Sequence, residues 1–132
     1  MSKGKDNYSN RGMNWATPDG YIECPLVFIS APWNDETEEY PSWMSGVCRM
    51  ALQEGCLPVA PFGMYSSLFG NMPRRGFVVS VLVQTLLSAC REVWVFDDEN
   101  GRLSENQAQE MIRAMEFDKP IRHFCMKEGL AQ

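Results

Sequence analysis

One stretch constrains the fold of this chain more than any other: EVWVFDDENGRLSENQAQEMIRA, residues 92–114. Its apolar run EVWVF ends in two carboxylates, and a turn containing Gly101 leads into a helical pattern. Ser104 and Gln107 have the spacing of a capping box, in which the serine hydroxyl and the glutamine side chain each bond to the other's backbone amide. The stretch therefore predicts a strand, a turn and a helix in succession, the repeating unit of α/β proteins.

The rest of the chain continues this alternation of strand and helix. Strands are expected at PLVFIS, CLPVAP and PIRHFCM, and helices at 42–53, ending at Gly55, and at 76–90, with a long loop over 62–74. In the helix that begins after Ser104, the apolar stripe is expected at four positions: Ala108, Met111, Ile112 and Met115. This order predicts a single α/β domain, a flavodoxin-like or Rossmann-like three-layer sandwich with a mostly parallel sheet of four to five strands.

The composition limits the kinds of molecule that the protein can bind. The 132 residues are 45% hydrophobic and carry a net charge of −5, which argues against nucleic-acid binding because that requires a clustered basic surface. Residues 1–23 are polar and lack periodicity, so we expect a flexible tail before a domain that spans 24–132. With no signal peptide and no apolar run of membrane-spanning length, a cytoplasmic protein without membrane contact is expected.

The five cysteines are widely spaced and only one histidine accompanies them. This pattern fits neither a zinc site nor a disulfide framework, and small buried thiols of a reduced protein are expected instead. No motif indicates a bound metal or cofactor.

The expected helix over 76–90 is apolar nearly all round. A helix without a polar face is buried on more than one side, and a chain this short has little of its own to cover the second side. We therefore expect a homodimer or larger assembly that uses this helix.

In a parallel sheet, the segments that follow the strands meet at one edge, where ligands bind. The candidates for a ligand site are the residues there: Ser30, Ala31, Pro32 and Trp33 after the first strand, Phe62 and Tyr65 after the second, and Asp97, Asp98 and Ser104 after the third. Aromatic faces, carboxylates and the free amides of a helix start would suit a nucleoside or nucleotide. Ordinary polar strand ends have similar compositions, so this pattern leaves both interpretations open.

Glu110 likewise has either an ordinary structural role or a functional one. Counted at about 100° per residue, it lies opposite the apolar stripe of its helix. Period alone favours a solvated glutamate that pairs with Arg113 or Arg102, whereas a functional role requires a pocket or a neighbouring subunit to cover that side.

Several segments, in matching order from Leu26 to Phe124, resemble the nucleoside 2-deoxyribosyltransferase-like superfamily, including small phage and bacterial members. VFISAPW resembles its opening ISGP or ISAP segment, and ALQEGCLPVAP resembles its AL..G..PVAP. VWVFDD, SENQAQEMIRA and KPIRHF resemble its strand, its Ser-x-Gly-Met-x-x-Glu-Ile-x-x-Ala helix and its Gly-Lys-Pro-Ile strand. Arg75 resembles an arginine often found before the long helix.

The resemblance implies that Glu110 is the catalytic nucleophile and that Ser104 opens its helix. In the transferases this glutamate attacks C1′ of a deoxyribosyl group and expels the nucleobase. By position, Asp97 or Asp98 could hold the base or the sugar hydroxyls, and Tyr65 or Phe62 could stack on the base.

Asn106 and Gln107 replace the Gly-Met pair of that superfamily. The sequence thus supports two hypotheses: an enzyme that cleaves an N-glycosidic bond or transfers the deoxyribosyl group, and a non-catalytic nucleotide-like ligand-binding or interaction module on the same fold.

Overall fold

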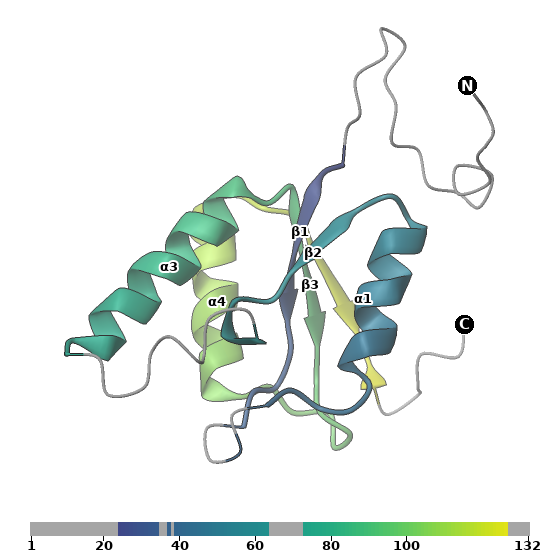
Figure 1. The fold of residues 1–132 in the computed structure, drawn as a ribbon, viewed down its shortest axis with the longest axis horizontal. Coiled ribbons are helices and arrows are strands. Elements are labelled where there is room, and N and C mark those ends of the chain that lie inside the picture. The colour runs from purple at the N-terminus through teal and green to yellow at the C-terminus, as the bar shows by residue number, and fades with distance from the viewer. Residues whose placement is uncertain (1–23, 35–36, 38, 64–72, 127–132) are drawn as a thin grey trace, which may run out of the picture.

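The computed structural model describes residues 24–34, 37, 39–63 and 73–126. In the described part of the chain, the elements with defined bounds are β1 (Leu26–Ser30), α1 (Met44–Gln53), β2 (Leu57–Val59), α3 (Arg75–Ala89), β3 (Glu92–Phe96), α4 (Glu105–Glu116) and β4 (Ile121–Phe124). In Figure 1, α1 covers one face of the sheet while α3 and α4 lie on the opposite side. The result is the three-layer α/β sandwich that the sequence predicts.

The sheet has four parallel strands in the order β2-β1-β3-β4. From β1 the chain first moves outward to β2, then returns past β1 to β3 and continues to β4. The order therefore reverses between β1 and β3, as in flavodoxin-like folds, and this switch point is where ligands bind in open parallel sheets.

Alternation along the strands decides which side chains reach that point. Val27 and Ile29 of β1 pack into the core beneath α1, whereas Phe28 packs into the core on the α3 and α4 side. Because successive side chains of a strand point to opposite faces, Ser30 belongs to the same face as Phe28. Its hydroxyl is thus directed toward α4.

The helix boundaries follow the chemistry at their ends. Gly55, expected to end the first helix, has a φ of 83°, a conformation that favours glycine. At α4, the Ser104 hydroxyl accepts a bond from the Gln107 amide, and the Gln107 side chain accepts one from the Ser104 amide. The predicted capping box is confirmed.

The apolar stripe predicted for α4 is wrong at three of its four positions; only Met111, which is partly buried, packs against the core. The buried residues of this helix are Gln107, Glu110 and Ala114, whereas Ile112 is 46% exposed and Met115 is 60% exposed. The reason is tertiary: hydrogen bonds between the Gln107 side chain and the ends of two strands fix the rotation of the helix about its axis.

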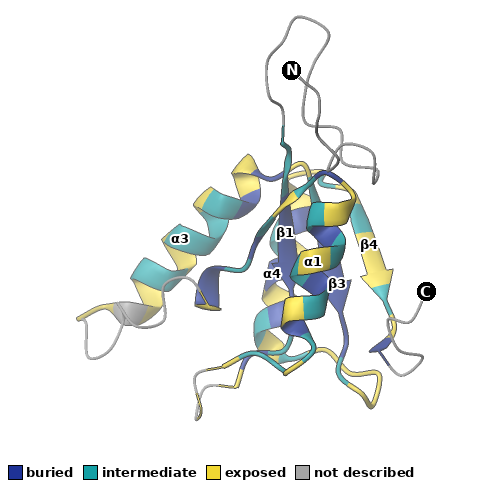
Figure 2. Ribbon diagram, turned by 45° about the vertical axis from the view of Figure 1, so that its right-hand side comes forward, coloured by how far each residue is buried: buried dark blue, intermediate teal, exposed yellow. Residues whose placement is uncertain are grey.

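α3 is apolar along its length but little of it is covered. Among its described side chains only Leu87 is buried, while Phe77 is 58% exposed and Val81 is 46% exposed. Figure 2 shows the helix coloured mostly as intermediate and exposed. The described residues therefore leave the second side of this helix uncovered.

The five cysteines are free thiols, but the expectation that all are buried is wrong. Only Cys90 is buried; Cys125 is exposed and the other three are intermediate. Within the described residues, no helix combines the length and the apolar character that crossing a membrane would require.

Candidate ligand-binding site

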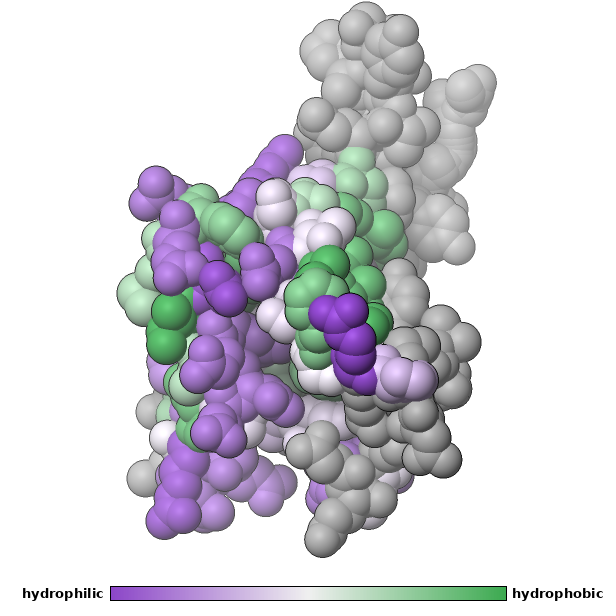
Figure 3. All heavy atoms as spheres, turned by 90° about the vertical axis from the view of Figure 1, so that its left-hand side faces the viewer, coloured by the Kyte–Doolittle hydropathy of each residue, from purple (hydrophilic) through white to green (hydrophobic). Residues whose placement is uncertain are grey.

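A cavity of about 560 Å³ lies between α3 and α4. It is lined by Phe62 and by residues of the two helices: Gly76, Val79, Ser80, Val83 and Gln84 from α3, and Asn106, Gln109, Glu110 and Arg113 from α4. Figure 3 looks onto this side of the molecule, where purple polar side chains predominate on the left and green apolar ones gather right of the centre. The volume of the cavity is in the range of small-molecule sites.

Gln107 anchors the start of α4 to the sheet. Its side-chain amide donates one hydrogen bond to the carbonyl oxygen of Ser30 (3.0 Å) and one to that of Phe96 (2.7 Å). Its side-chain oxygen accepts a bond from the backbone amide of Ser104 at 2.9 Å. One fully buried side chain thus ties the helix to the carboxyl ends of β1 and β3, at the switch point of the sheet.

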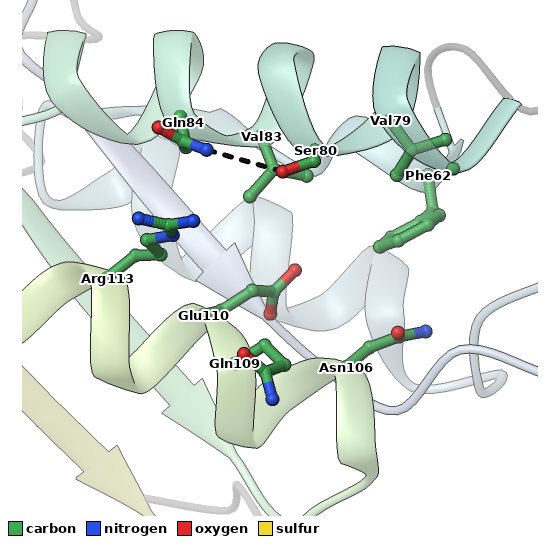
Figure 4. A pocket seen from close by; sticks show the side chains of 10 residues that line it. Phe62, Val79, Ser80, Val83, Gln84, Asn106, Gln109, Glu110 and Arg113 are labelled. Atoms are coloured by element: carbon green, nitrogen blue, oxygen red, sulfur yellow. Dashed lines mark hydrogen bonds between the residues drawn. The ribbon is translucent and has the colours of Figure 1, made fainter. Parts of the chain in front are cut away.

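Glu110 lies one turn further along α4 and is only 6% exposed. The Ser30 hydroxyl, 80 residues away in sequence, donates a 2.7 Å hydrogen bond to its Oε1. In Figure 4 its carboxyl group lies in the space between the two helices, facing α3. The interpretation from helical period alone, a solvated glutamate paired with Arg113 or Arg102, is therefore wrong.

Burial raises the pKa of Glu110 to about 8, and the hydrogen bond from Ser30 lowers it in part. Desolvation disfavours the charged form of a carboxyl group, whereas a bond donated to that form favours it. Glu110 is therefore mostly protonated at neutral pH. A strongly perturbed carboxyl group that lines a cavity is a typical feature of functional sites.

An aromatic cluster borders the cavity. Trp33 stacks on Phe62 with ring centroids 5.5 Å apart and meets Tyr40 edge-on at 4.9 Å. Of these three rings, only that of Phe62 lines the cavity. Burial, followed by the charge of Glu110, raises the pKa of the Tyr40 hydroxyl, which puts Tyr40 in the electrostatic environment of the site.

The two aspartates after β3 are not brought into the cavity. Asp97 accepts a hydrogen bond from the Met126 amide at 2.8 Å and lies 3.6 Å from His123. Asp98 accepts bonds from the backbone amides of Asn100 and Arg102, and so holds its own turn together. Both carboxylates serve the local structure around the end of β3.

The other residues predicted at this edge have different positions. Ala31 is buried in the core beneath α1, and Pro32 lines a second, smaller cavity together with Asp98. Arg75 is the first residue of α3, but its side chain, like the whole of Tyr65, is outside the described part of the chain. Ser104 caps α4 and is not a lining residue.

The sequence prediction missed the polar stripe of α4 that faces the cavity. Asn106 and Arg113 are separated from Glu110 by four and three positions, so they share its side of the helix. The same spacing would have identified them once Glu110 was assigned to a pocket. Ser80 and Gln84, which are hydrogen-bonded to each other at 3.3 Å, were missed because the long apolar run around them indicated only packing.

The fold and the site define a small α/β domain with a buried carboxyl group in a cavity beside the switch point of a parallel sheet. The chain belongs to the family described as "Domain of unknown function (DUF7768)", whose sequence profile matches residues 25–124. No curated protein matches the chain.

Proposed function

We propose that this protein cleaves or exchanges the N-glycosidic bond of a nucleoside or nucleotide, with Glu110 as the nucleophile. The observation that carries the proposal is the Glu110 carboxyl group, buried in the cavity and bonded by Ser30 at 2.7 Å. The sequence resemblance to the nucleoside 2-deoxyribosyltransferase-like superfamily, which implies a catalytic glutamate at this position, supports the same assignment.

The reaction proceeds in two displacements. The ionised Glu110 carboxylate forms a bond to C1′ of the sugar as the C1′–N bond breaks, and the nucleobase leaves with the bonding electron pair and takes up a proton. Water or a second base then attacks C1′, gives up a proton, and releases the carboxylate. The hydrogen bond from Ser30 holds one carboxylate oxygen so that the other can attack.

The experiment is to incubate the protein with the four 2′-deoxynucleosides and their 5′-monophosphates, with and without an acceptor base, and to measure free base by chromatography. Wild type should release base, and Glu110→Ala should be slower by a factor of at least about 10³, as expected when a covalent nucleophile is removed. The control Glu105→Ala changes an exposed glutamate of the same helix and should keep its activity. Equal release by wild type and Glu110→Ala would falsify the mechanism.

The pH profile gives a second measurement. Because the nucleophile must be ionised and its pKa is about 8, the rate should rise about tenfold per pH unit below that value and level off above it. A rate that is already flat from pH 6 would contradict the role of Glu110.

A non-catalytic binder of a nucleotide-like ligand is the second candidate, and the Asn106-Gln107 pair favours it. Gln107 fixes the helix to the strands with a bulky, polar side chain, at the position where the superfamily that the chain resembles has a methionine. A non-catalytic binder would show an increase in melting temperature with a nucleotide-like ligand but no release of base.

We also propose that the protein forms a homodimer or larger assembly through α3. The exposed apolar side chains of this helix, Phe77 and Val81, support the proposal. From Gly76 to Ala89 the helix carries no charged residue, so two copies with a net charge of −5 each can meet there without repulsion between adjacent charges.

A further inference from the structure

The stripe of α4 that faces the cavity combines two kinds of charge chemistry. Glu110 supplies the buried carboxyl group, and Arg113 supplies the only cation among the lining residues that the structure describes. In Figure 4 the Arg113 side chain extends from α4 toward Gln84 of α3, on the other side of Glu110 from Asn106. The guanidinium group and the carboxyl group therefore belong to the same cavity.

Arg113 does not neutralise Glu110. The pKa of Glu110 is set by burial and by the bond from Ser30, without a contribution from the guanidinium group. Arg113 instead bonds to Glu116 at 3.2 Å, in a pair whose side chains are 42% and 55% exposed. Such an exposed pair is weak, and a guanidinium group has five N–H donors, so Arg113 retains donors for an anionic ligand.

The start of α4 is not open to an anion, because side chains already occupy it. The Ser104 hydroxyl accepts a bond from the Gln107 amide, and the Gln107 side chain covers the Ser104 amide. Glu105 adds a negative charge in the first turn. An anion would therefore meet repulsion at the helix start and, two turns further along, the guanidinium group of Arg113, which has donors besides the one that bonds to Glu116.

We propose that the cavity selects nucleotides over nucleosides, with Arg113 as the residue that binds the 5′-phosphate. This inference rests on the proposed function and adds the substrate class to it. Glu110 and Arg113 both line the cavity, three positions apart on α4, so a ligand with C1′ at Glu110 can direct its 5′-phosphate to Arg113. The apolar side chains of Phe62, Val79 and Val83 remain to contact the base and the sugar.

The experiment measures binding in a Glu110→Gln background, so that no substrate is consumed. The four 2′-deoxynucleosides, their 5′-monophosphates and inorganic phosphate are titrated by calorimetry. Arg113→Gln removes the guanidinium group. Glu116→Gln also breaks the ion pair between Arg113 and Glu116 but leaves the guanidinium group in place. Arg49→Gln, an exposed change on α1 across the sheet, controls for net charge.

The monophosphates should bind at least tenfold more tightly than the nucleosides, and Arg113→Gln should abolish that preference. Glu116→Gln and Arg49→Gln should keep it. Equal affinity for both ligand classes, a preference that survives in Arg113→Gln, or an equally strong response to inorganic phosphate alone would overturn the proposal.

The binding experiment and the base-release assay can fail separately. If wild type releases no base but the phosphate preference depends on Arg113, the proposed function fails while the substrate class stands. If wild type releases base equally well from nucleosides and monophosphates, and Arg113→Gln changes neither rate, the substrate class fails while the function stands.

Discussion

At the scale of single residues, Glu110 is the side chain whose environment departs most from that of a solvated carboxyl group. It is buried, it has one hydrogen-bond donor, and its pKa is raised to about 8. A buried carboxyl group with a raised pKa lowers the free energy of unfolding at high pH, where it must ionise inside the folded protein. Because the bond from Ser30 offsets only part of the effect of burial, the site is maintained mainly by the packing around it.

This cost can be measured. Because the pKa of Glu110 is higher in the folded state than in the unfolded state, the folded protein binds more protons between about pH 4.5 and 8. Glu110 therefore contributes stability that is complete below about pH 4.5 and is lost as pH rises through 8. Relative to Glu110→Gln, the free energy of unfolding of wild type should fall by up to about 1.4 kcal/mol per pH unit across this window.

Denaturant unfolding at a series of pH values checks this prediction. Glu105→Gln, which changes an exposed carboxylate on the same helix, should leave the pH dependence of wild type intact. Parallel curves for wild type and Glu110→Gln would show that the carboxyl group is not buried in solution.

At the scale of elements, the rotation of α4 decides what the site contains. The sequence correctly predicts where this helix begins, because the capping box is local chemistry between Ser104 and Gln107. Its apolar stripe wrongly predicts which side is buried. The polar bonds of Gln107 to β1 and β3 outweigh the exposure of Ile112 and Met115, since an unpaired buried carbonyl is costly.

Replacing Gln107 by Met tests this explanation. The change keeps a flexible side chain of similar length but leaves the Ser30 and Phe96 carbonyls without these bonds. The free energy of unfolding should fall by about 2–4 kcal/mol, since a single unsatisfied buried group costs about 1–3 kcal/mol. Gln109→Met, an exposed glutamine on the same helix, should change it by less than about 0.5 kcal/mol. Equal effects in chemical denaturation would contradict the anchoring role of Gln107.

At the scale of the whole molecule, the described residues leave an apolar surface of α3 exposed. Phe77 and Val81 are exposed although the sequence around them has the composition of a buried helix. Self-association would resolve this conflict without any change in the fold.

Light scattering at micromolar concentration tests the assembly. Wild type should have at least twice the mass of the chain, and Phe77→Glu with Val81→Glu should return it to the monomer mass, because two carboxylates would have to be buried in the interface. The control Leu57→Glu changes a side chain that is 44% exposed on β2 and should leave the mass unchanged. A monomeric wild type would contradict the proposed assembly.

The sequence by itself determined the order of the elements, the parallel sheet and the start of α4, because strand length, apolar runs and capping chemistry are local properties. Only the tertiary structure decided the contents of the site. It brought Ser30 to Glu110 across 80 positions, turned the polar side of α4 inward, and directed Asp97 and Asp98 to local bonds instead of the cavity. The physical reason is that burial and hydrogen bonding between distant segments set the rotation of a helix and the pKa of a carboxyl group, and neither is encoded in the spacing of residues along one helix.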